Sequence, residues 1–388
     1  MRRALPFVLL CVFTLIWPLI LRAIFAPDVE PVLNLNSLHP LARGLAAHQL
    51  GMWTAQNAEA ATARTREANP EWDFMGRTFL AWSAANLALR EPEKKVEHLA
   101  AMDQLIARTL ELEQQNGFRY FLMAYGQGDG YLQRPARSLF VDGEVALMLA
   151  LRRLIEDRPQ EKALLHARLA VMEARLRSSP LLAAESYPDE CWTFDHANAM
   201  AAFKIADALD ETDHSELISS WLRIARERLI DPATGLLVSS YALDGTVKDG
   251  PEGSTIWLTA HALDLVDPAF AADQYSRART YLDHSIAGFW LAREWPHGSD
   301  ARPDIDSGIQ IPIVEASPSS SAFALMAAAN FRDEEALSGL LASLNFAAFP
   351  VSDATGTHFA ASNAVGDSVV LYALTLGPAW NTVKARHP

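Results

Sequence analysis

Apolar residues recur at helical spacing along almost the whole chain from about residue 41 onward. The dipeptides Glu91-Pro92, Arg158-Pro159, Asp231-Pro232 and Asp267-Pro268 interrupt this pattern, as helix breakers do. The pattern predicts helices near 41–66, 72–90, 93–116, 138–157, 160–178, 193–210, 214–229, 254–265, 269–292, 317–330, 333–344 and 363–376. Strand signal is scarce, and Leu236 to Tyr241 followed by Asp244-Gly245 predicts one short hairpin.

Helices of similar length that follow one another in pairs fit two architectures. They can close as two concentric rings, the (α/α)6 barrel, or they can stack as an open solenoid. A solenoid usually shows a sequence period, and none is visible here. We therefore expect an all-α fold, an (α/α)6 barrel over residues 41–388. Its site should lie at one end, among the polar, aromatic-rich loops 126–137, 185–198, 241–254 and 294–321.

The N-terminus carries an uncharged apolar run from Ala4 to Leu21, preceded by Arg2 and Arg3. Its length is at the short end of what spans a bilayer. A cleaved signal peptide and an uncleaved anchor both fit such a run, but no good small-residue cleavage site follows it. We expect a transmembrane signal anchor over residues 1–25 and a Pro-rich linker over residues 26–40. Because positive residues stay inside, the barrel would face the periplasm or the cell exterior.

Composition narrows the function. The chain has 388 residues, half of them hydrophobic, and a net charge of −14, which argues against nucleic acid as a partner. Its two cysteines, Cys11 and Cys191, build neither a disulfide framework nor a cysteine zinc site. Dinucleotide, nucleophile-elbow and zinc-protease motifs are absent from the sequence. We expect no metal and no cofactor, and a small-molecule substrate.

The segment Glu185–Asn198 gathers four carboxylates, a cysteine, a histidine and three large aromatics at the start of a helix. Asp195 stands where a helix N-cap is expected, but it can also line the inside of the barrel. Glu144 interrupts an apolar helix, where a charge is costly unless it is paired or faces a cavity. Acid–base catalysis needs one protonated and one ionised group. We predict Glu144 and Asp195 as catalytic, with Asp306 joining them from the 294–321 loop.

Further candidates for substrate binding lie in the same loops or beside these acids. They are Tyr125, Tyr131, Asp142, Ser186, Asp189, Trp192, His196, Trp257 and Trp295. Each also has a plainer interpretation, such as core packing for the tryptophans. By the same reasoning Glu185 and Glu190 are expected to be solvent-facing loop charges, and Cys191 a small core residue.

Several motifs together resemble the linalool dehydratase/isomerase family. They are Ser220-Trp-Leu, Arg228-Leu-Ile-Asp-Pro-Ala-Thr-Gly-Leu-Leu, Ser240-Tyr, Val266-Asp-Pro-Ala-Phe and Tyr187-Pro-Asp189, in an order that runs from about Pro70 to Leu376. The resemblance implies an (α/α)6 barrel and a periplasmic, cofactor-free enzyme that dehydrates and isomerises an allylic alcohol. It also implies a homo-oligomer with sites near the subunit contacts.

The chain departs from that family at the functional positions. Glu144 aligns with the family's catalytic histidine, and Ser186 and Asp195 align with its two functional cysteines. A lyase or isomerase that acts on an apolar alcohol is therefore expected to use acids instead. Two alternatives stay open: a glycoside hydrolase-like enzyme with a carboxylate pair that acts on a sugar, and a non-catalytic, membrane-anchored binding protein.

Overall fold

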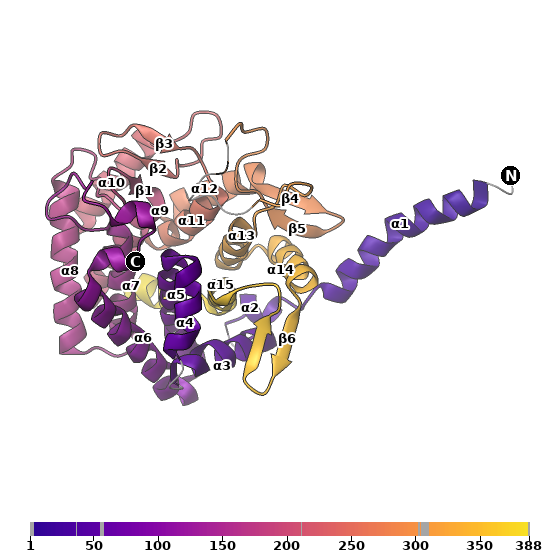
Figure 1. Cartoon of the computed structure of the whole chain (residues 1–388), viewed down its shortest axis with the longest axis horizontal. Helices are drawn as coiled ribbons and strands as arrows, with labels where there is room; N and C mark the ends of the chain where they lie inside the picture. Colours follow the sequence, from indigo (N-terminus) through magenta and orange to yellow (C-terminus); the bar gives the residue numbers. More distant parts are fainter. Residues whose placement is uncertain are drawn as a thin grey trace.

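Six helices form a closed inner ring. The structure is a computed structural model that describes residues 4–35, 37–54, 58–210, 212–301, 303 and 310–386. The ring helices are α5 (Pro70–Arg90), α7 (Leu139–Ile155), α9 (Thr193–Asp210), α11 (Gly253–Val266), α13 (Pro318–Asn330) and α15 (Ala364–Thr375). Each contacts the next in this order, and α15 contacts α5 again, so the ring closes (Figure 1). This closure confirms the predicted α/α barrel architecture and excludes an open solenoid.

A second layer of helices surrounds the ring. Its members are α3 (Pro40–Thr54), α4 (Ala58–Ala68), α6 (Lys95–Asn116), α8 (Pro159–Arg177), α10 (Ser215–Arg228), α12 (Pro268–Tyr281) and α14 (Glu334–Ala348). Helices α6, α8, α12 and α14 each pack on the ring helix that precedes them in the chain, and α3 packs on α15. Helix α10 reaches α9 through Trp221, whose ring stacks on His196 with centroids 6.1 Å apart.

The two layers differ as their sequences require. All but the last residue of α7 are buried, whereas α10 buries one face and exposes the other. Side-chain caps fix where the ring helices begin. Asn69 accepts the backbone N–H of Glu71 at 2.8 Å, and Ser138 accepts that of Val141 at 3.4 Å. These caps fix the first turns of α5 and α7.

The C-terminal helix closes one end of the ring. Helix α16 (Pro378–Arg386) contacts α5, α9 and α11. The backbone N–H of Ala379 donates to Asn86 at 3.1 Å, and Lys384 pairs with Asp264 at 2.8 Å. Asn86 and Asp264 both lie in the C-terminal parts of their helices. Helix α16 therefore covers the end at which the ring helices finish, and we call the opposite end, at which they begin, the open end.

Strands are short and lie outside the rings. The predicted hairpin exists as β2 (Ser240–Tyr241) and β3 (Val247–Asp249), and β1 (Cys191–Trp192) extends it. The helix predicted over 269–292 ends at Tyr281, because residues 283–292 form the hairpin of β4 (Asp283–Ile286) and β5 (Phe289–Ala292) around Gly288. A third hairpin, β6 (Pro350–Asp353) and β7 (Gly356–Phe359), packs on α3.

The prediction of a transmembrane anchor is wrong for the part of the chain that the structure describes, where no helix combines the length and apolarity needed to cross a membrane. Helix α1 (Ala4–Phe25) projects from the barrel (Figure 1), but its last turn belongs to the globular domain. Arg22 donates to the carbonyl of Gly288 and to the hydroxyl of Ser338, each at 2.8 Å. Phe25 meets Phe346 of α14 edge to face. The short helix α2 (Glu30–Leu33) follows.

Candidate active site

Glu144 and Asp195 lie on neighbouring ring helices near the open end of the barrel. Glu144 is on the second turn of α7 and Asp195 on the first turn of α9, and these helices pack closely where Gly143 stands. A Cβ at Gly143 would lie 3.5 Å from the carbonyl oxygen of Asp195 and 3.6 Å from the backbone nitrogen of Ala199. We call the two carboxyl groups the Glu144–Asp195 pair. The ring brings together two acids that are distant in the sequence.

The environment of the pair favours protonation. Glu144 is 0% and Asp195 1% exposed. Both Glu144 oxygens and Oδ1 of Asp195 lack a hydrogen-bond partner among the described residues. Burial raises the pKa of Glu144 to about 8; the nearby side chain of Thr78 opposes this rise, and the negative charge of Glu71 adds to it. Burial also raises the pKa of Asp195 well above its usual value, helped by the charges of Glu144 and Glu71, although Ser186 opposes the change.

A loop between α8 and α9 orients Asp195. The hydroxyl of Ser186 donates a short hydrogen bond to Oδ2 of Asp195. The loop itself is fixed by Glu185, whose carboxylate accepts the backbone N–H groups of Leu132, Gln133 and Asp189 at 2.7 to 2.8 Å. The expectation that Glu185 faces solvent is therefore wrong, because it is fully buried and ties two loops together. Asp189 adopts a left-handed backbone conformation in the turn, with φ of 53°.

Aromatic residues lie near the pair at the open end of the barrel, which we call the mouth. The ring of Tyr125, 38% exposed, stacks on the buried ring of Tyr187 with centroids 4.6 Å apart. The indole of Trp192 donates to Glu190 at 3.2 Å, and Tyr125 reaches the same carboxylate at 3.5 Å. Tyr187 donates through its hydroxyl to Glu71. Of the residues predicted for substrate binding, Tyr125, Ser186, Asp189 and Trp192 thus gather around the loop that holds Asp195.

His196 is engaged in the core. The backbone N–H of Ala184 donates to its Nε2 at 3.0 Å, so Nε2 is the acceptor. Nδ1 therefore carries the proton and donates it to the carbonyl of Trp192 at 2.7 Å. Burial lowers the pKa of His196 to about 4. Both ring nitrogens are committed to backbone groups, which makes His196 a structural support for the start of α9.

Four other predicted residues form hydrogen bonds or ion pairs with groups other than the pair. Asp142 forms ion pairs with Arg137 and Arg168 that tie α7 to the outer layer. Tyr131 donates to the carbonyl of Ser186 at 3.1 Å from within the core. Trp257 donates to Ser320 at 3.2 Å, and Trp295 donates to Glu252 at 3.3 Å. Asp306 falls outside the described residues.

Two further features concern metal binding and the Cys191 thiol. In the described part of the chain no group of three or more His, Cys, Asp or Glu side chains is placed to hold a metal ion. Burial also raises the pKa of the Cys191 thiol far above neutral pH, which removes the thiolate that a nucleophile requires.

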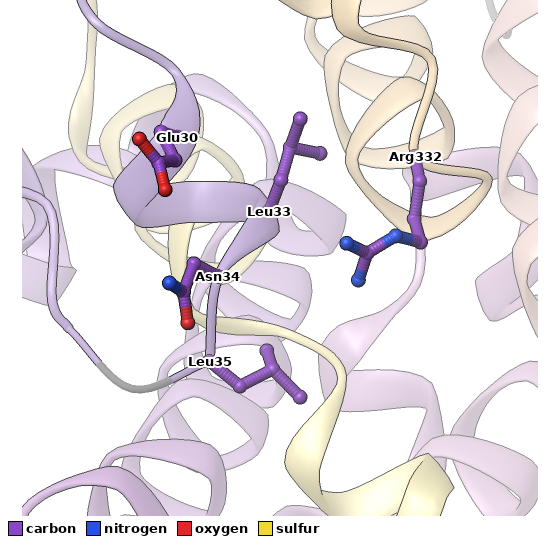
Figure 2. Close-up of a pocket in the computed structure, with 5 residues that line it drawn as sticks. All are labelled: Glu30, Leu33, Asn34, Leu35 and Arg332. Atoms are coloured by element: carbon purple, nitrogen blue, oxygen red, sulfur yellow. The ribbon is translucent and has the colours of Figure 1, made fainter.

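A surface hollow of about 450 Å³ lies elsewhere (Figure 2). Glu30, Leu33, Asn34, Leu35 and Arg332 line it, and the guanidinium of Arg332 points across it toward α2. Arg332 follows the C-terminal end of α13, so the hollow is at the closed end of the barrel. It is remote from the Glu144–Asp195 pair.

Sequence comparison does not identify the chain, whereas comparison of folds does define its architecture. Neither a known protein family nor a curated protein matches the sequence. The fold is similar to the GH76A α-1,6-mannanase of Salegentibacter sp. HEL1_6, with a TM-score of 0.54 and 10% identity over 88% of this chain and 98% of that one. It is also similar to a family 105 glycoside hydrolase of C. acetobutylicum ATCC 824, with a TM-score of 0.53 and 11% identity over 89% and 100%.

These similarities correct the family resemblance inferred from short motifs. Both of these solved structures are glycoside hydrolases, and neither is a linalool dehydratase/isomerase. The motif residues stabilise local backbone structure, namely a turn and a helix start. The side chain of Asp231 accepts the N–H and hydroxyl of Thr234 in a tight turn, and Asp267 caps α12. Asp-Pro sequences at turns and helix starts arise from local backbone chemistry. The lyase and isomerase prediction falls with the resemblance.

Proposed function

We propose that this protein is a glycoside hydrolase-like enzyme in which Glu144 and Asp195 cleave a glycosidic bond. The observation that carries the proposal is the Glu144–Asp195 pair, two buried carboxyls with unpaired oxygens on adjacent ring helices at the open end of the barrel. Glycosidases with a similar fold add support, since this architecture accommodates sugar hydrolysis. The aromatic rings of Tyr125 and Trp192 at the mouth suit the apolar faces of sugar rings.

The chemistry requires the two acids to take different protonation states. Two buried carboxyls that repel one another hold one proton between them over a wide pH range. The protonated member donates its proton to the departing glycosidic oxygen, and the ionised member activates a water molecule or attacks the sugar carbon. The hydrogen bond from Ser186 supports the ionised form of Asp195. In this assignment Glu144 is the acid.

Because both carboxyls are solvent-inaccessible, a substrate reaches them only when side chains at the mouth move aside. Tyr125 is the most exposed of the aromatic residues described there. Replacing Tyr125 with alanine should therefore change KM more than it changes the protonation of the pair.

The test is release of reducing sugar by the purified protein from a panel of neutral oligosaccharides and polysaccharides that includes α-1,6-mannan. We expect activity that Glu144→Gln and Asp195→Asn each lower at least about a hundredfold, as loss of a general acid or base does. Glu93→Gln, in the short turn that follows the C-terminal end of α5, is the matched control, because it removes an exposed carboxylate remote from the mouth. A cleaved substrate whose turnover is unaffected by both active-site variants would remove these residues from the mechanism.

A further inference from the structure

Glu71 is a third acid at the open end of the barrel. It is the second residue of α5, the ring helix that contacts α7. Sequence reasoning missed it, because an acid in the first turn of a helix is ordinary and needs no further explanation. Its partner marks it out here. The hydroxyl of Tyr187, a residue that is only 3% exposed, donates to Oε1 of Glu71.

The Tyr187 hydroxyl donates one hydrogen bond and accepts another. The backbone N–H of Met123 donates to the Tyr187 oxygen at 3.0 Å, so this oxygen acts as the acceptor there. A phenol carries one proton, which is then free to point at Glu71. A donor aimed at a carboxylate favours its ionised form. The arrangement therefore supports a negative charge on Glu71.

The same two-residue segment fixes Asp195. Ser186 donates to Asp195 while its neighbour Tyr187 donates to Glu71. The segment is held by backbone hydrogen bonds from Ser186 and Tyr187 to the carbonyl of Glu190, at 2.8 and 3.2 Å. It is also held by the stack of Tyr187 on Tyr125. One turn thus sets the positions of two acids that come from different ring helices.

The negative charge of Glu71 acts on the Glu144–Asp195 pair, and no cation of the described residues forms an ion pair with either of these two carboxyl groups. After burial, the charge of Glu71 contributes to raising the pKa of both Glu144 and Asp195. Of the other ionisable groups nearby, Asp73 and Arg77 neutralise one another on α5 at 2.9 Å. Tyr241 faces Asp195 from β2 as a neutral phenol, and Glu190 is held by Trp192. Among the described residues no lysine or arginine forms an ion pair with Glu144 or Asp195.

The geometry points to Glu71 as a positioning residue that keeps a proton on the Glu144–Asp195 pair through its negative charge, with Tyr187 holding that charge in place. Only the catalytic consequence of this inference rests on the proposed function. The charge coupling itself is a property of the free protein. Failure of one can therefore be told from failure of the other.

The test is an infrared titration of the full chain without substrate, which follows the carbonyl band of the protonated carboxyl that disappears in Glu144→Gln. We expect Glu71→Gln to lower the pH midpoint of this band by about one pH unit, because a like charge nearby has been removed. Glu71→Asp should largely retain the original midpoint. Glu93→Gln removes the same charge just beyond the C-terminal end of α5 and should leave the midpoint unchanged.

Tyr187→Phe gives a second, independent route should Glu71→Gln fold poorly. It leaves the ring and its stack in place and removes only the hydroxyl, so the midpoint should move in the same direction by a smaller amount. A midpoint that matches the Glu93→Gln control in both variants would overturn the inference and leave Glu71 with a structural role. With an active substrate in hand, the basic limb of the pH profile should move with the infrared midpoint.

Discussion

Replacing Glu144 with glutamine removes a buried ionisable group and keeps the size of its side chain. In the native protein the pKa of Glu144 is about 8, against a usual value of 4.5. The unfolded chain therefore loses this proton near pH 4.5, whereas the folded chain retains it until about pH 8. Because the folded state binds the extra proton in this window, the stability of the wild-type protein falls as pH rises from 4.5 to 8.

The size of the effect follows from the same two values. The difference between 4.5 and about 8 corresponds to about 5 kcal/mol of unfolding free energy, at about 1.4 kcal/mol for each pH unit. The glutamine variant lacks this loss. Its stability relative to wild type should therefore increase by up to about 5 kcal/mol between pH 4.5 and pH 8. Asp195 adds to this increase in stability, because the variant removes the Glu144 charge that raises the pKa of Asp195.

Urea unfolding followed by tryptophan fluorescence at several pH values measures this difference. The buried amide of the variant has its own cost, but that cost does not vary with pH, so the pH dependence isolates the charge. Glu93→Gln serves as the exposed control and should track wild type. A difference between Glu144→Gln and wild type that is constant across the window would refute the argument that Glu144 is buried without a partner.

Three further results are expected. Burial lowers the pKa values of His196 and His261 to about 4, so folding stability should fall as pH drops from 6.5 to 4, and replacing His261 with glutamine should flatten this acid limb by about 3 kcal/mol in a urea series. Gly126→Ala would place a methyl group 2.3 Å from the ring of Tyr187, so we expect destabilisation of about 1–3 kcal/mol, read as a lower Tm. Cys191, buried and with a raised pKa, should resist iodoacetamide in the folded protein and react once urea unfolds it, as mass spectrometry would record.

Interactions between residues that are close in the sequence determined most of the secondary structure. Apolar periodicity and helix-breaking prolines placed both ends of α5 and α8, and the start of α12, within about two residues of their observed positions. The same signals misjudged the segment after Tyr281, where a hairpin around Gly288 replaces the predicted helix. A strand is stabilised by pairing with another strand, and the periodicity within one segment does not reveal that partner. Glu144 was identifiable because a charge within an apolar helix is rare.

The closure of the ring decided where the acidic side chains lie. Asp142 and Glu144 are two positions apart, yet the rotation of α7 turns one toward outer-layer arginines and the other into the barrel. Glu71 and Tyr187 are 116 positions apart, and no local pattern connects them. The sequence by itself determined which segments are helical, because that follows from neighbours three and four positions away. Only the tertiary structure decided which acids share a buried site, because burial and charge depend on helices that are distant along the chain.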